Sequence, residues 1–213
     1  LYGGRTSLLV AGAATVLCLA LAAVLGVVSG FAGGLTDTVL AGFLDLLWAF
    51  PVYLLAISLS IVLISQDLQL GPLRIAGDSL ALPVLILGIV YVPYVARPIR
   101  AEVAALRSAE FVTAARSAGA SPWRILWRHV LPQLRGTLLA FLPLVAGMVL
   151  LTEASLSILS VGVQAPHASW GTLIADGQAL LYTRPLVAIA PGLAVLVTVL
   201  ALNTLAQSLG RRA

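Results

Sequence analysis

Few side chains in this sequence could carry out chemistry, and their types exclude most familiar sites. All 12 basic residues are arginine, so the chain has no Walker A lysine, no Schiff-base lysine and no lysine general base. The single cysteine, Cys18, lies in an apolar run, and the histidines, His129 and His167, stand far apart without a His-Glu-x-x-His pattern. The sequence therefore predicts no catalytic residue, no metal site and no cofactor bound by this chain.

The composition is that of a membrane protein. Of 213 residues, 12 are basic and 8 acidic, a charged fraction of 9% against roughly 25% in an average soluble domain. Hydrophobic residues make up 61% and the mean hydropathy is +1.08, too apolar for the polar surface of one soluble core. The pI near 9.8 does not indicate nucleic-acid binding, because the arginines interrupt membrane-length apolar runs.

Charge-free intervals predict the membrane spans. A transmembrane helix needs about 20 mostly apolar residues, and the run between Arg5 and Asp37 is one that satisfies this. We predict an all-α polytopic membrane bundle that forms one transmembrane domain over residues 1–213. Its five spans are expected at about 7–31, 37–65, 80–104, 137–160 and 186–208.

The placement of arginine predicts how these spans are oriented. Nine of the 12 arginines fall within residues 97–135 or in the C-terminal tail, which five spans place on the same side of the membrane. Because cytoplasmic loops carry the excess of basic residues, the 105–135 loop and the C-terminus are predicted to be cytoplasmic. The N-terminus of this chain then lies outside.

Two acidic residues fall inside the predicted spans. Asp45 lies two to three turns into the second span, and Glu153 lies in the outer half of the fourth. A charge at the bilayer centre costs about 2.5–3.5 kcal/mol on insertion scales, so both should face the bundle or a water-filled path. They either line a pathway or form hydrogen bonds to a neighbouring helix or partner subunit, and the sequence leaves both open.

The polar segment 105–135 should fold as two short helices that meet at an angle. Gly119 suits the left-handed position just past the end of the first helix. Ser121 and Pro122 follow as the N-cap and first residue of the second helix. That helix should end just before Pro132, because the residue preceding a proline disfavours helical geometry.

The second of these short helices carries an aromatic and basic surface. Trp123 and Trp127 are four residues apart and share a face, while Arg124 and Arg128 share the adjacent face. Such residues dominate protein-binding hot spots, although an amphipathic helix on anionic lipid would show a similar pattern. The break before Ser121 favours a protein-docking elbow, because a helix lying on lipid needs no such break.

The same segment resembles the EAA loop of permeases from ATP-binding-cassette (ABC) importers. The family pattern is Glu-Ala-Ala, three residues, Gly, nine residues and Ile-x-Leu-Pro. Thr113 stands here at the Glu position and His129 at the Ile position, two departures that are familiar in the peptide and nickel branch. The residues that match the pattern are Ala114, Ala115, Gly119, Leu131 and Pro132.

A second stretch supports the same resemblance. Residues 153–164 and 169–171 resemble the family's Glu-Ala-Ser-Leu-Ser and Ser-Trp-Gly runs, with Ser160 where the family usually has Gly. The resemblance covers nearly all of the chain and is to the C-type permease of dipeptide, oligopeptide or nickel importers. It implies a type I importer permease core. Such permeases usually have one more span before this point, so we expect the full-length protein's N-terminal span to be missing.

The resemblance also implies partners in a bacterial inner membrane. They are a B-type permease forming a heterodimer, two ATPase subunits that bind ATP and Mg, and an extracytoplasmic solute-binding protein. The elbow at 111–131 would sit in a groove of one ATPase, so that ATP-driven closure rocks the bundle between inward- and outward-facing states. The predicted coupling residues are Ala114, Ala115, Arg116, Gly119, Ala120, Ser121, Pro122, Trp123, Arg124, Trp127, Arg128, His129, Leu131 and Pro132.

On the outer side, the resemblance leaves roles and cargo open. His167 and Trp170 are expected to meet the binding protein or form a gate, although an aromatic anchor at the membrane surface also explains Trp170. Peptide is the favoured cargo, and nickel or another small solute is the alternative. A secondary transporter is disfavoured because no inverted repeat is seen, and an intramembrane protease because neither a serine nor a paired-histidine pattern is present.

Overall fold

The computed structural model describes residues 2–65, 68–70 and 73–210; residues 1, 66–67, 71–72 and 211–213, with both C-terminal arginines, lie outside the described residues. The described chain is helical apart from one small antiparallel hairpin, which confirms the predicted all-α class. Its elements are α1 (Tyr2–Ala32), α2 (Gly34–Ala49), α3 (Val52–Ser65), β1 (Leu68–Leu70), β2 (Leu73–Ile75), α4 (Ala81–Val90), α5 (Val92–Arg107), α6 (Glu110–Ser117), α7 (Pro122–Ile125), the π-helix η1 (Leu126–Val130), α8 (Leu134–Ile158), α9 (Trp170–Gln178) and α10 (Leu186–Gly210).

Three single helices in the described part of the chain are long and apolar enough to cross a membrane. These are α1, α8 and α10, which overlap the spans predicted at 7–31, 137–160 and 186–208. Two further pairs, α2 with α3 and α4 with α5, meet the same criterion only when each pair is taken together. The structure therefore offers three spans, or five if each bent pair is one span.

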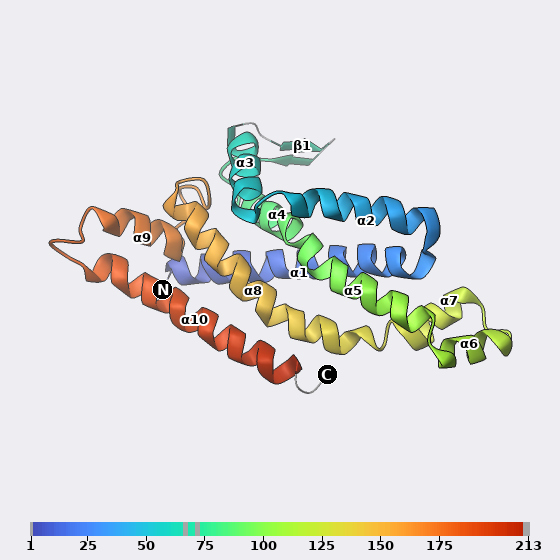
Figure 1. Ribbon diagram of the computed structural model, residues 1–213. Helices are drawn as coiled ribbons and strands as arrows, with labels where there is room; N and C mark the ends of the chain where they lie inside the picture. The colour runs from blue at the N-terminus through green and yellow to red at the C-terminus, as the bar shows by residue number, and fades with distance from the viewer. Residues whose placement is uncertain (1, 66–67, 71–72, 211–213) are drawn as a thin grey trace.

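The segment predicted as the second span, 37–65, is not one continuous helix. It consists of α2 and α3, which meet at an angle of 89°. Phe50 between them has an extended backbone, with φ −87° and ψ 134°, because the residue before Pro51 disfavours the helical region. As a result α3 stands across the direction of α2 (Figure 1).

The segment predicted as the third span, 80–104, is bent more gently and extends further. Its halves, α4 and α5, meet at 42° around Tyr91. Pro93 lies in the first turn of α5, where its missing N–H costs the helix no hydrogen bond. The helix continues to Arg107, which brings its arginines to the base of the elbow.

Helix α1 runs through the middle of the molecule and is crossed by α5 and α8 (Figure 1). Its contact with α5 depends on small residues, as is usual between membrane helices. A Cβ added to Gly26 would lie 2.8 Å from the carbonyl oxygen of Ala96, and one added to Gly30 would lie 2.6 Å from that of Arg100. The two backbones therefore touch at these points.

The fold separates two ends of the bundle (Figure 1). One end holds α6 and α7, the turn between α1 and α2, and the end of α5. The opposite end holds the start of α1, α9 and the start of α10. The polar segment 105–135, which contains the elbow predicted at 111–131, and the loop carrying His167 are thus at opposite ends.

Candidate functional site

The corner of the elbow has the geometry that the sequence predicted. After α6, Gly119 adopts φ +83°, and the N–H groups of Gly119 and Ala120 donate to the carbonyls of Arg116 and Ala115 at 3.0 Å each. This pair of bonds is a Schellman motif, which ends a helix through a left-handed residue. Ser121 then caps α7 by accepting a hydrogen bond from the Arg124 N–H at 3.3 Å.

The second helix of the elbow is less regular than expected. Only four residues are α-helical, and Leu126–Val130 then form a π-helix in which the Leu131 N–H donates to the Leu126 carbonyl at 2.9 Å. The helix ends before Pro132, as predicted. The side chain of Gln133 donates to the His129 carbonyl at 3.1 Å, which satisfies an acceptor at this irregular end.

The elbow has one buried face and one exposed face. Ile125 and Val130 are fully buried, so they fix the elbow to the bundle. Trp123 and Trp127 are 67% and 57% exposed, and their rings meet edge to face with centroids 5.5 Å apart. Two large aromatic side chains exposed side by side on a fixed support are a protein-binding feature.

The remaining predicted coupling residues surround this aromatic pair to different degrees. Arg116, Arg124 and Arg128 are exposed, and within the described chain none of them forms an ion pair. His129 is half-buried, with its ring 6.3 Å from that of Phe111. The other eight predicted coupling residues divide equally. Four are exposed, namely Ala114, Gly119, Ser121 and Pro122, and four are half-buried, namely Ala115, Ala120, Leu131 and Pro132.

Hydrogen bonds tie the base of the elbow to the bundle, and sequence reasoning missed them. Arg107, the last residue of α5, donates from Nη1 to the Phe31 carbonyl at 3.3 Å, at the end of α1. Thr137 on α8 donates from Oγ1 to Glu102 Oε2 on α5 at 2.7 Å. The helix entering the elbow, α5, is therefore fastened to α1, and the helix leaving it, α8, is fastened to α5.

A bidentate ion pair lies next to these contacts. Arg100 on α5 donates from Nε to Asp37 Oδ1 at 2.5 Å and from Nη2 to Asp37 Oδ2 at 2.8 Å. Ser29 on α1 also donates to Asp37 Oδ1, at 2.5 Å. The pair holds the α1–α2 turn against α5, a role that nothing in the local sequence around Asp37 indicates.

Asp45 also pairs with an arginine, but on the surface of this chain. It forms an ion pair with Arg97, whose Nε lies 3.1 Å from Asp45 Oδ1, and the Asp45 side chain is 61% exposed. The Arg97 guanidinium lies 5.2 Å from the centre of the Trp48 ring, a cation–π distance. The sequence left open whether Asp45 lines a pathway or forms a hydrogen bond to a neighbouring helix. In the structure Asp45 on α2 accepts a hydrogen bond from Arg97 on α5.

Glu153 is fully buried and satisfied. Its two carboxylate oxygens accept hydrogen bonds from the hydroxyls of Ser7 on α1, at 3.0 Å, and Ser157 on α8, at 2.8 Å. The hydrogen bond between Glu153 and Ser7 on α1 matches the second of the two sequence alternatives, a hydrogen bond to a neighbouring helix. The Glu153 side chain is closed off from solvent in this conformation.

The outer loop places His167 and Trp170 differently. His167 is exposed and, with Asp176 and Gln164, lines a polar cavity of about 270 Å³. Trp170 is the first residue of α9, after the capping box of Ser169 and Thr172. Its ring packs on α1, where a Cβ added to Gly4 would lie 2.9 Å from it. His167 is thus available to a partner, whereas Trp170 is mainly packed within the bundle.

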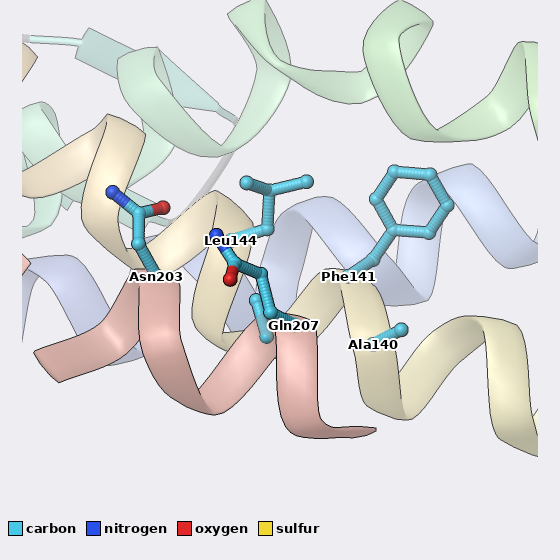
Figure 2. A pocket seen from close by; sticks show the side chains of 6 residues that line it. Ala140, Phe141, Leu144, Asn203 and Gln207 are labelled. Carbon is cyan, nitrogen blue, oxygen red and sulfur yellow. The ribbon is translucent and has the colours of Figure 1, made fainter. Parts of the chain in front are cut away.

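A cavity that sequence reasoning missed lies between α8 and α10. It has a volume of about 280 Å³, and Figure 2 shows the amides of Asn203 and Gln207 from α10 together with Phe141 and Leu144 from α8. The signal in the sequence was the pair of amides four residues apart on a predominantly apolar helix. The cavity offers polar hydrogen-bonding groups within apolar walls.

In the part of the chain that the structure describes, no group of three or more His, Cys, Asp or Glu side chains could hold a metal ion.

Comparison with known proteins agrees with this description. The family described as "Binding-protein-dependent transport system inner membrane component" matches residues 22–213. A putative peptide transport system permease protein of Brucella suis biovar 1 is 36% identical over 98% of this chain and 66% of its own length. A glutathione transport system permease protein of Pectobacterium atrosepticum is 33% identical over 98% of this chain and 65% of its own. The oligopeptide transport system permease protein of Bacillus subtilis is 33% identical over 97% and 64%.

The chain spans about two-thirds of the length of these relatives. Among solved structures, an inward-facing form of the MetNI methionine ABC transporter superposes with a TM-score of 0.69 at 18% identity, over 99% of this chain and 92% of the other. At that identity the likeness establishes the fold, which is that of an ABC importer permease. With a family match over residues 22–213, this chain belongs to the binding-protein-dependent transport system inner membrane components.

Proposed function

We propose that this chain is the membrane-spanning permease subunit of an ABC importer and forms part of its translocation pathway. Peptides are the proposed cargo, because relatives at 33–36% identity are named for peptide, glutathione and oligopeptide transport. Nickel or another small solute is the alternative cargo, since the sequence resemblance extends to that branch.

The elbow is the observation that carries the proposal. A lever between an ATPase and a membrane bundle has to be rigid, and α6 and α7 are joined by a Schellman motif and a capped helix start. It also has to offer a binding surface, which the exposed Trp123 and Trp127 provide with their neighbouring arginines. We place the 111–131 elbow in a groove of one of two ATPase subunits, which bind ATP and Mg and carry out hydrolysis.

The other proposed partners meet different surfaces of this chain. A solute-binding protein meets the opposite end of the bundle, where His167 is exposed. A homologous B-type permease completes a heterodimer, and the exposed Asp45–Arg97 pair faces either that partner or the pathway. The buried position of Glu153 supports a structural role over pathway lining.

We place the chain in the bacterial cytoplasmic membrane, with the elbow and the C-terminus on the cytoplasmic side and the N-terminus of this chain outside. The distribution of arginine supports this orientation, since Arg97, Arg100, Arg107, Arg116, Arg124, Arg128 and Arg135 all lie between the start of α5 and the start of α8, at or near the elbow end.

Uptake measurements test the proposal. Cells that lack their own peptide and nickel importers would receive the complete transporter and be offered labelled dipeptide, a longer peptide and nickel in parallel. We expect ATP-dependent uptake of at least one peptide, and no uptake when the partner ATPase carries an inactivating substitution in its Walker A lysine. Uptake that continues with the inactive ATPase would contradict the proposal.

A further inference from the structure

We propose that Glu153 is a positioning residue that sets the arrangement of the extracytoplasmic surface. It holds the loop 161–170 and the start of α9 against α1 and α8, and so presents this end of the bundle to the binding protein in one conformation. The inference rests on the proposed function for the identity of that partner and for the side of the membrane on which this surface lies.

Each of the two serine hydroxyls beside Glu153 takes part in two hydrogen bonds. Ser7 donates to Glu153 Oε2 and accepts the Trp170 N–H at 3.0 Å. Ser157 donates to Glu153 Oε1 and accepts the Val163 N–H at 3.1 Å. Both oxygens of Glu153 thus act as acceptors, and each serine joins one of them to a backbone N–H.

These bonds form two relays that start at one carboxylate. One relay runs from Glu153 on α8 through Ser7 on α1 to the first residue of α9. The other runs from Glu153 through Ser157 to Val163, in the loop that follows α8. Glu153 and Ser7 are 146 residues apart in sequence, so the carboxylate joins the start of α1 to α8 and to the loop between α8 and α9.

Close backbone contacts surround the same carboxylate. A Cβ added to Gly162 would lie 2.4 Å from Ser157 Oγ, and one added to Gly171 would lie 2.6 Å from the Ala154 carbonyl oxygen. The loop and α9 therefore rest directly on the turn of α8 that carries Glu153. Because these backbone contacts leave no space between the loop and α8, removing the Glu153 acceptor leaves a buried serine hydroxyl without a partner. Such a loss lowers local stability more than the loss of a hydrogen bond that water can replace.

A set of substitutions separates the two relays. Glu153→Gln keeps the shape but offers one acceptor oxygen, so only one of the two hydroxyl protons keeps its acceptor. Ser7→Ala removes only the relay to Trp170, and Ser157→Ala removes only the relay to Val163. Ser155→Ala is the matched control, because Ser155 lies on the same helix between Glu153 and Ser157, is half-buried, and its hydroxyl donates to the Leu151 carbonyl rather than to Glu153.

The experiment uses the assembled transporter in lipid nanodiscs, with and without its binding protein. Two quantities are measured on each variant: amide hydrogen exchange at Val163 and Trp170, and the ratio of binding-protein-stimulated to basal ATPase activity. We expect Ser7→Ala to accelerate exchange about tenfold at Trp170 only, and Ser157→Ala to do so at Val163 only. Glu153→Gln should accelerate exchange at one or both amides and lower the stimulation ratio, while Ser155→Ala changes neither quantity.

Unchanged exchange at both amides in Ser7→Ala and Ser157→Ala would overturn the relays, even if Glu153 variants fail to fold. Faster exchange with a wild-type stimulation ratio in every variant would overturn the positioning role. If the wild-type chain assembles with no ATPase, the proposed function fails instead, and the exchange data still report on the relays.

Discussion

Arg100 donates two parallel hydrogen bonds to the Asp37 carboxylate. This ion pair fastens the turn between α1 and α2 to α5, the helix that leads into the elbow. The two residues are 63 positions apart in sequence. Because both are partly exposed, at 36% and 26% of their side-chain areas, the pair avoids most of the desolvation cost of a buried ion pair. It supports the base of the elbow where force from a partner would enter the bundle.

The first prediction concerns this pair. Asp37→Ala should lower the free energy of unfolding by about 1–2 kcal/mol, because it leaves the Arg100 guanidinium without its bidentate acceptor. Ser29→Ala should cost less, since it removes only one of three bonds to the carboxylate. The measurement is denaturant unfolding in mixed micelles, extended to the double variant Asp37→Ala with Arg100→Ala. Additive effects of the two single substitutions would show that the side chains do not interact.

The second prediction tests the contact of α1 with α5. Gly30→Ala should destabilise the bundle by about 1–3 kcal/mol, because the new Cβ would lie 2.6 Å from the Arg100 carbonyl oxygen and the helices would have to separate. Gly12→Ala is the matched control on the same helix, since nothing lies within 4 Å of its Cβ position. It should be neutral or slightly stabilising. Equal thermal stability of the two variants would contradict this packing.

The third prediction concerns the corner of the elbow. Gly119→Val should abolish transport and uncouple ATP hydrolysis while leaving membrane insertion intact, because a β-branched residue resists φ +83°. No atom lies within 4 Å of a Cβ at this position, so the effect arises from the backbone alone. Gly119→Asn should retain much of the activity, since Asn tolerates the left-handed region. Paired uptake and ATPase assays measure this, and normal transport by the Val variant would refute the rigid-lever interpretation.

The fourth prediction separates binding from stability on the elbow. Trp123→Ala should weaken ATPase binding by about 2 kcal/mol, roughly 30-fold, and leave the unfolding transition unchanged, because the side chain is 67% exposed. Ile125→Ala should instead destabilise the elbow, because Ile125 is fully buried. Tyr182→Ala serves as the control for an exposed aromatic residue at the opposite end. Equal loss of ATPase binding in the Trp123 and Tyr182 variants would argue against a specific docking surface.

The elbow could be predicted from the sequence because its determinants are neighbours along the chain. A left-handed glycine, an N-cap serine and a proline in the first turn act within a few residues of one another, and Gly119, Ser121 and Pro122 adopt those roles. The family motif in the same segment then suggested its use. The π-helical turn at Leu126–Val130 has no comparably local signal.

Other features depend on packing between distant segments. Pro51 is visible in the sequence, but whether a proline kinks a helix slightly or turns it through 89° is decided by what the two halves pack against. The partners of Asp37 and Glu153 lie 63 and 146 residues away, beyond the reach of periodicity or capping rules. For Glu153 sequence reasoning gave the need for a partner and left its identity open, whereas for Asp37 it indicated no partner.

Site-specific photo-crosslinking in the assembled transporter tests the central claim most directly. A photoreactive phenylalanine analogue would replace Trp123 or Trp127 on the elbow, or Tyr182 at the other end of the bundle. The account predicts crosslinks to an ATPase subunit from positions 123 and 127 and none from position 182. Crosslinks to the ATPase from position 182, with none from the elbow, would contradict it.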